Sequence, residues 1–266
     1  MKKKEFERLE SWFGGYVDTF RERGVLPGPL EFKVAHSARV AENAALIAAG
    51  LGLDAAEAGL ARAAGLLHDT GRFTQFRRFA SFLDAKSLDH GAEGRRVLEE
   101  KAALLFSCAA ARDRLLCAVQ YHNRKAEELP AGLSPAEDSL LRLVRDADKL
   151  DIMGELVGSV ETDGFRGLHA MVPDIKLTLD LTPGVLESAA RGETLSIKDL
   201  FTLADIMVMV AAWFYDLNYS PARRLAAERG FLERLRRQLP ASARLEVFFG
   251  GLSKAAASPG LAYRAS

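Results

Sequence analysis

Histidine is the residue type in this sequence with the clearest capacity for chemistry. One histidine is followed directly by an aspartate, as His68-Asp69, and a run of acidic residues lies within Arg145-Asp-Ala-Asp-Lys-Leu-Asp151. Neutral imidazole and carboxylate groups together suit divalent metals such as Mn, Fe, Co, Ni or Zn. The histidines of the chain are His36, His68, His90, His122 and His169.

A metal site must be weighed against a plainer interpretation. A single histidine on a helix is most often a packed or surface residue, and one His-Asp pair is a weak motif. Four histidines in order, followed by an acidic run, are harder to explain as packing. His169 fits no place in this order, and we expect it to be structural or exposed.

The His68-Asp69 pair indicates how two ions could be held. Adjacent residues inside a helix point in different directions, but at a helix end the backbone can turn both toward one ion. A carboxylate also has two oxygens and can bridge two ions. We therefore expect one ion between His36, His68, Asp69 and an aspartate of the acidic run. A second ion would lie between Asp69, His90 and His122, with positions open for water or substrate, as in two-metal phosphoryl-transfer sites.

Several polar residues near these ligands could bind a substrate. Arg72 lies three residues after Asp69, past the expected helix end, where its guanidinium could bind two phosphate oxygens. Lys149 could hold a phosphate or only balance the neighbouring acids. Asn123 and Arg124 follow His122 and could line the same cleft. Asp89 could orient His90 or, equally, begin the next helix.

Helical patterns must position these residues along nearly the whole chain. Apolar residues recur at three- and four-residue steps, and cap signals occur at Asp54 and at Ser134-Pro135. Gly71 is expected to stop the His68-Asp69 helix. The segment Val172–Leu181 alternates weakly and is expected to be a connection. The predicted helices cover 3–23, 31–52, 54–69, 197–217 and 221–238, and a further helix runs from 134 to beyond 148.

Composition excludes several classes of protein. The 266 residues carry 36 basic and 36 acidic side chains, which removes the basic excess typical of nucleic-acid binding. Two cysteines support neither a disulfide scaffold nor a thiolate metal site. The N-terminus lacks an apolar signal segment, and no apolar run approaches the ~18 residues of a membrane span. We expect a cytoplasmic protein that contacts neither nucleic acid nor membrane.

These motifs resemble those of the HD-domain superfamily of metal-dependent phosphohydrolases. The resemblance covers about residues 31–151 and rests on His36, His68-Asp69 and Asp148. It implies that Asp148 is the ligand from the acidic run, with Asp146 as the alternative, and that His90 and His122 are the extra histidines of two-metal members. No Gly-Tyr-Pro follows the motif, unlike in the cyclic-dinucleotide phosphodiesterase branch.

The resemblance implies an all-α HD-domain helical bundle over residues 1–266, with additional C-terminal helices in 152–266. The expected function is hydrolysis of a phosphate ester, such as a nucleotide or another small phosphomonoester, by a metal-activated water. Asp69, Arg72 and Lys149 are the expected catalytic residues. The alternatives are a di-iron oxygenase of the superfamily and a metal-retaining module that senses a nucleotide. A homo-oligomer is left open.

Overall fold

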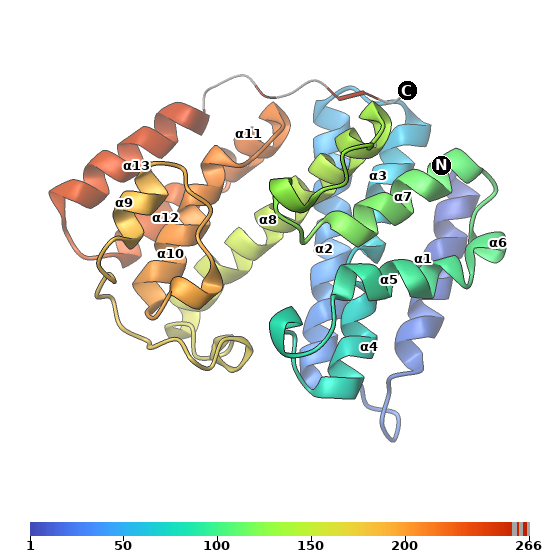
Figure 1. Ribbon diagram of the computed structural model, residues 1–266, viewed down its shortest axis with the longest axis horizontal. Helices are drawn as coiled ribbons and strands as arrows, with labels where there is room; N and C mark the ends of the chain where they lie inside the picture. The colour runs from blue at the N-terminus through green and yellow to red at the C-terminus, as the bar shows by residue number, and fades with distance from the viewer. Residues whose placement is uncertain (257–259, 261–262, 265–266) are drawn as a thin grey trace. The chain divides into compact units, whose positions relative to one another are not determined.

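The computed structural model describes residues 1–256, 260 and 263–264, and its regular elements are helices (Figure 1). Residues 1–256 contain no strand, and pairing of extended backbone is limited there to isolated bridges, Glu22–Val25 and Lys176–Thr202. The predicted all-α class is confirmed, and Val172–Leu181 is a connection. In the described part of the chain, no helix combines the length and apolar content needed to cross a membrane.

The chain divides into two compact units. The N-terminal unit comprises Met1–Asp148 together with residues 263–264, and the C-terminal unit begins at Lys149. The boundary falls inside one long helix, α8 (Pro135–Asp163). All six expected metal ligands therefore belong to the N-terminal unit, whereas Lys149 belongs to the C-terminal unit.

Local capping signals set several helix starts in the N-terminal unit. The Asp54 carboxylate accepts hydrogen bonds from the backbone N–H groups of Ala56 and Glu57, both at 2.9 Å. Ser134 and Glu137 form a reciprocal capping pair at the start of α8. The remaining elements of this unit are α1 (Lys3–Asp18), α2 (Gly28–Gly50), α3 (Ala55–Leu67), α4 (Thr70–Phe79), η1 (Asp84–Lys86), α5 (His90–Glu99), α6 (Ala102–Leu105), α7 (Ala109–Tyr121) and η2 (Ala126–Glu128).

Small residues allow α2 and α3 to lie close together. Their contact faces carry buried alanines such as Ala44 and Ala64. A Cβ on Gly65 would lie 2.9 Å from the Val40 carbonyl oxygen, a separation that Cβ atoms do not adopt. Close packing of these two helices brings His36, on α2, next to His68, at the end of α3.

Gly71 does not stop a helix, contrary to the expectation from sequence. The helix is interrupted at His68 and Asp69 instead, and Gly71 is the second residue of α4. A Cβ on Gly71 would overlap the His90 carbonyl oxygen and lie 2.6 Å from the Gly94 amide nitrogen. This glycine is therefore required because α4 and α5 are in close contact, and that contact places His90 beside Asp69.

We expect Gly71→Ala to destabilise the protein and to loosen the site. An added methyl group in a packed contact costs about 1–3 kcal/mol, because the neighbouring backbone must shift. Thermal unfolding should show a lower Tm than wild type. Metal analysis should show a partial loss of bound metal, because His90 would move away from Asp69. Gly14→Ala in α1 is the control, since no atom lies within 4 Å of its added Cβ. An unchanged Tm in Gly71→Ala would contradict this role.

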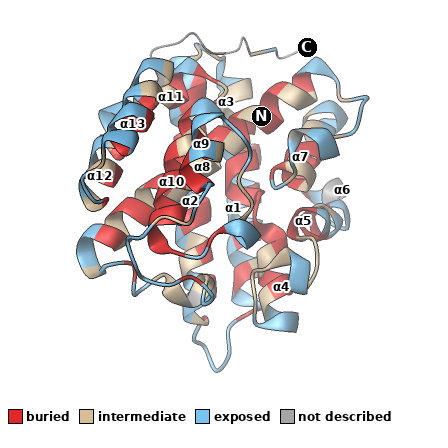
Figure 2. Ribbon diagram, turned by 60° about the vertical axis from the view of Figure 1, so that its left-hand side comes forward, coloured by how far each residue is buried: buried red, intermediate tan, exposed pale blue. Residues whose placement is uncertain are grey.

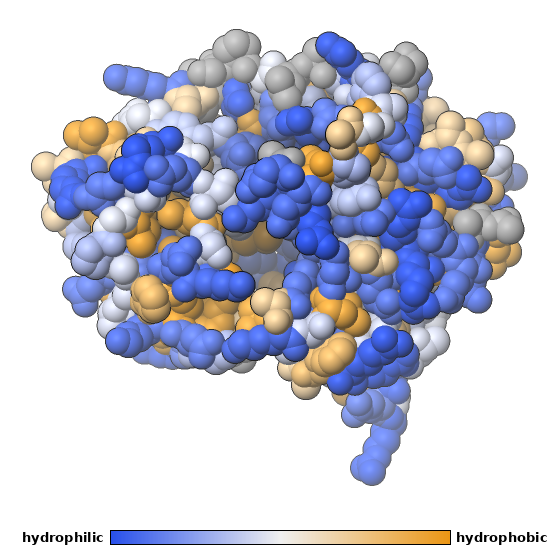
Figure 3. Space-filling model, viewed as in Figure 1, coloured by the Kyte–Doolittle hydropathy of each residue, from blue (hydrophilic) through white to orange (hydrophobic). Residues whose placement is uncertain are grey.

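The C-terminal unit adds shorter helices to the second half of α8. The segment predicted as one helix over 221–238 is split, because Gly230 takes a left-handed conformation at φ 65°. Helix α10 is buried over nearly its whole length (Figure 2). Phe201 of this unit is exposed, and Figure 3 shows hydrophobic side chains between hydrophilic ones on the face that it draws. Its elements are η3 (His169–Met171), α9 (Val185–Ala190), η4 (Ile197–Asp199), α10 (Leu203–Ala212), η5 (Trp213–Tyr215), α11 (Ser220–Glu228), α12 (Phe231–Gln238) and α13 (Ala243–Ala256).

Candidate metal centre

The break between α3 and α4 turns His68 and Asp69 toward the same site. His68 is the C-cap of α3, and Asp69 has φ −95° and ψ 15°, outside both helices. The Thr70 hydroxyl donates to the Leu67 carbonyl at 2.7 Å across this break. Both His68 and Asp69 are buried. The helix end therefore turns both side chains toward one site, as predicted from the sequence.

The first histidine pair consists of His36 and His68. Their Nε2 atoms lie 3.3 Å apart. Asp148 Oδ1 lies 3.2 Å from Nε2 of His36 and 3.6 Å from Nε2 of His68. Asp69 Oδ2 lies 3.6 Å from each of the same two nitrogens. Two imidazoles and two carboxylates thus converge on one point.

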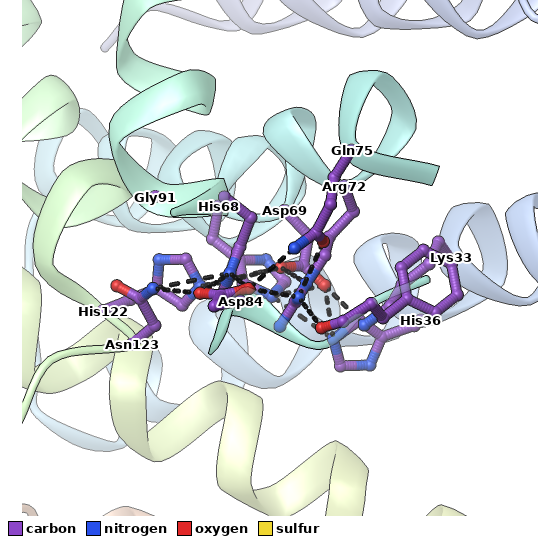
Figure 4. A network of polar contacts seen from close by, with 12 residues as sticks. Lys33, His36, His68, Asp69, Arg72, Gln75, Asp84, Gly91, His122 and Asn123 are labelled. Atoms are coloured by element: carbon purple, nitrogen blue, oxygen red, sulfur yellow. Dashed lines mark hydrogen bonds and ion pairs between the residues drawn. The ribbon is translucent and has the colours of Figure 1, made fainter. Parts of the chain in front are cut away.

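The second histidine pair consists of His90 and His122. Their Nε2 atoms lie 3.0 Å apart. The other oxygen of Asp69, Oδ1, lies 3.4 Å from Nε2 of His90 and 3.6 Å from Nε2 of His122. Each oxygen of Asp69 therefore faces a different histidine pair, and Figure 4 shows Asp69 between His122 and His36.

Hydrogen bonds at the Nδ1 atoms of the rings determine which ring nitrogens can bind metal. His68 Nδ1 lies 2.8 Å from the Gly65 carbonyl oxygen, and His122 Nδ1 lies 2.8 Å from the Val119 carbonyl oxygen. Carbonyl oxygens only accept, so these Nδ1 atoms carry the protons and the Nε2 atoms of the neutral rings present lone pairs.

This arrangement fits cations. Lone pairs on His90 and His122 face each other at 3.0 Å, which is repulsive unless a proton or a metal ion lies between them. Asp148 Oδ1 is also buried and has no hydrogen-bond partner in the described structure. Within the described residues, groups able to hold a metal ion include His36, His68 and Asp69 on one side, and Asp69, His90 and His122 on the other.

Electrostatics keep the site in its metal-binding protonation state. Burial alone would raise the pKa of Asp69, but the Lys33 ammonium and other neighbouring charges hold it well below the usual range. Burial, together with the charge of Arg72, lowers the pKa of His90 to about 3. The carboxylate is therefore ionised and the His90 ring is neutral, which are the forms that bind metal.

Lys33 is a site residue that the sequence argument missed. Its ammonium lies 2.7 Å from Asp69 Oδ2, and only 11% of its side chain is exposed. Lysine is rarely this buried without a partner. The signal in the sequence was its position on α2, one turn before His36 and on the same face.

Asp84 is the second residue that was missed, because it lies in the short turn η1 outside any predicted helix. Its carboxylate is 2.7 Å from His90 Nδ1. It also accepts hydrogen bonds from Arg72 at 2.9 Å, Gln75 at 2.8 Å and Asn123 at 3.0 Å. Burial would raise the pKa of Asp84, but His90, Arg72 and Gln75 lower it. Asp84 therefore orients the His90 ring, whereas Asp89 begins α5 as its N-cap.

We expect Asp84→Ala to weaken one metal position selectively. Loss of a carboxylate that orients a ligating histidine typically lowers metal affinity by about 10–100-fold. Competition with a chelator, followed by metal analysis, should show that about one ion per chain becomes labile while the other is retained. Asp113→Ala, at an exposed position on α7, is the matched control. Equal loss of both ions would contradict a role confined to His90.

Three of the four expected substrate-binding residues lie in the hydrogen-bond network beside His90. One amino group of Arg72, Nη1, donates to the Phe82 carbonyl at 2.5 Å and to Asp84, and Arg72 Nε lies 3.5 Å from Asp69 Oδ1. Asn123 donates to Asp84 and Asp89, and Arg124 pairs with Asp89. All three residues therefore belong to the network beside His90, with much of their capacity used by protein groups.

Lys149 forms an ion pair inside the C-terminal unit, where its ammonium lies 2.6 Å from Asp216 Oδ2. Its role in catalysis stays a prediction. His169 lies outside the metal cluster, with Nε2 2.7 Å from the Ile175 carbonyl oxygen. Asp148 is the member of the acidic run that meets the histidines, and Asp146 is buried but is not a member of any metal-binding group in the described residues.

Residues 34–153 match the family model described as the HD domain, a range that includes all six candidate ligands. Searches of the curated proteins and of the solved structures found no match.

Proposed function

We propose that this chain, whose residues 34–153 match the HD domain, is a metal-dependent hydrolase that hydrolyses a small phosphomonoester, such as a nucleotide, with two divalent metal ions. One observation carries this proposal. The two oxygens of Asp69 face separate histidine pairs, at 3.4–3.6 Å from the four Nε2 atoms. A single carboxylate so placed is suited to bridging two cations.

The proposed ligands fall into two sets that share Asp69. His36, His68 and Asp148 complete the first set, and His90 and His122 complete the second. The second set has fewer protein ligands, which leaves more room for water or substrate. Bound divalent ions would lower the pKa of a water molecule and offset negative charge on phosphoryl oxygens.

The protein's own groups would position the substrate and fix the protons. Arg72 lies beside Asp69 and carries a permanent charge, so it is the proposed partner for a phosphoryl oxygen. Asp84 holds the proton on His90 Nδ1 and so keeps Nε2 of that ring available. Asn123, Arg124 and Lys149 remain proposed substrate contacts of lower weight, because protein carboxylates already occupy them.

A second candidate function is oxidation of a substrate at a di-iron pair. The observation that favours it is the set His90, His122 and Asp69, since two histidines and one carboxylate are typical of non-haem iron oxygenases. Hydrolysis is preferred because Lys33 and Arg72 add positive charge beside Asp69, which suits a phosphate.

The test is metal analysis of the purified protein together with a panel of phosphate esters. Separate samples loaded with Mn, Fe, Co, Ni or Zn would be assayed for release of inorganic phosphate. We expect about two ions per chain and hydrolysis of at least one phosphomonoester class. Absence of hydrolysis in every metal form, with substrate-dependent oxygen uptake by the iron form, would overturn this proposal in favour of the oxygenase.

A further inference from the structure

Lys33 is the cation at the centre to which the proposed function assigns no contact with the substrate. It lies on α2 and contacts Asp69 Oδ2 at 2.7 Å, on the His36 side of the network (Figure 4). Arg72 lies on the other side of the same carboxylate, with its Nε 3.5 Å from Asp69 Oδ1. Asp69 is thus flanked by one cation at each oxygen.

The two cations differ in how firmly they are held. Arg72 has three further acceptors on Gln75, Phe82 and Asp84. For Lys33, Asp69 is the one carboxylate within ion-pair distance among the described residues. The ammonium otherwise lies 5.5 Å from the centre of the Phe82 ring. An ammonium has three N–H donors, so Lys33 retains capacity to bind another acceptor.

Charge balance indicates what that acceptor is. Without metal, the three carboxylates Asp69, Asp84 and Asp148 and the two cations Lys33 and Arg72 leave one net negative charge. Two divalent ions would change this to three net positive charges. A phosphomonoester dianion offsets two of them, whereas a phosphodiester offsets only one.

Metal binding would also remove the reason for Lys33 to remain on Asp69. Oδ2 of Asp69 lies 3.6 Å from the Nε2 atoms of both His36 and His68, so a cation between these groups would draw on the same oxygen. A buried ammonium that loses its counter-charge is costly unless another anion replaces it. The Lys33 ammonium would therefore need a new anionic partner once metal binds, and an anionic group of the substrate would supply it.

We propose that Lys33 binds the phosphoryl group of the substrate and, with Arg72, gives the site its preference for phosphomonoester dianions. This inference rests on the proposed function for its substrate class. It adds a binding residue from α2, opposite Arg72 from α4, with the Phe82 ring close to both cations at 5.5 and 5.9 Å.

The test uses inorganic phosphate as the probe, so that it does not depend on turnover. Calorimetric titration of the metal-loaded protein at about pH 8, where phosphate is a dianion, would compare wild type with Lys33→Met. We expect the variant to keep its metal and its Kd for phosphate to rise by about 10–100-fold, as for loss of one charged hydrogen bond. Lys33→Arg should recover part of the affinity. Arg78→Met, exposed on α4, should match wild type.

Several outcomes would overturn the proposal. Lys33→Met could bind phosphate as wild type does, or wild type could bind none. A variant that loses metal, yet regains wild-type phosphate affinity when metal is restored, would show that Lys33 only supports Asp69. If Lys33→Met does not fold, Lys33→Gln provides the same comparison. Lys33-dependent phosphate binding without hydrolysis of any ester would overturn the proposed function and leave this inference standing.

Discussion

Asp69→Ala is expected to remove both metal ions and to abolish hydrolysis. The two carboxylate oxygens each face one histidine pair, so a single substitution deletes a ligand from both proposed positions. Metal analysis should fall from about two ions per chain to nearly none, and kcat/KM should fall by at least about 10³-fold. Each of the other proposed ligands is assigned to one position, so its loss should mainly affect one ion.

Two variants separate metal loss from loss of the fold. Asp69→Asn keeps the shape of the side chain and removes the charge, so circular dichroism should show a folded protein with weakened metal binding. Asp113→Ala removes a carboxylate from the exposed surface of α7 and should retain wild-type metal content. Two ions in Asp69→Ala, or one ion in wild type, would contradict the bridging arrangement.

Arg72→Ala is expected to reduce activity strongly without removing metal. The guanidinium cannot bind a cation, because it stays protonated and only donates hydrogen bonds. Loss of its contact with a phosphoryl oxygen should cost about 1.5–4 kcal/mol, or one to three orders of magnitude in kcat/KM. Arg72→Lys should recover only part of the loss, since an ammonium lacks the two-pronged contact.

A control is needed because Arg72 has a structural role as well. Arg72 also anchors the loop before α5 through the Phe82 carbonyl and Asp84. Gln75 anchors the same loop, through Asp84 and the Leu88 carbonyl, but carries no charge. A much smaller loss in Gln75→Ala than in Arg72→Ala would assign the effect to charge. Full kcat/KM in Arg72→Ala with both metals bound would make Arg72 structural and direct attention to Lys149 or Arg124.

The sequence alone indicated the helical class and the converging set of ligands. Apolar periodicity and capping residues act over a few positions, so Asp54 and Ser134 could be identified as helix starts without a structure. The His68-Asp69 pair carried similar local information, because a helix end was the one place where both side chains could meet one ion. Residue type and order therefore indicated the histidines and Asp69, whereas the choice of Asp148 from the acidic run came from the resemblance to the HD-domain superfamily.

Other features depended on contacts between residues that are distant in the chain. Gly71 was predicted to end a helix, but its role follows from the approach of α5, which begins nineteen residues later. Asp84, not Asp89, holds His90, because the irregular loop before α5 folds back over α4 through Arg72 and Gln75. No short-range pattern predicts the path of such a loop.

The electrostatic state of the centre was also decided by tertiary structure. Lys33 was assigned no role from the sequence, and only the packing of α2 beside the α3–α4 break buries its ammonium against Asp69. Likewise, the division of the two Asp69 oxygens between His36–His68 and His90–His122 depends on helices brought together by Gly65 and Gly71. Sequence specified which groups could bind metal because that depends on residue chemistry, whereas orientation, burial and charge pairing depend on long-range packing.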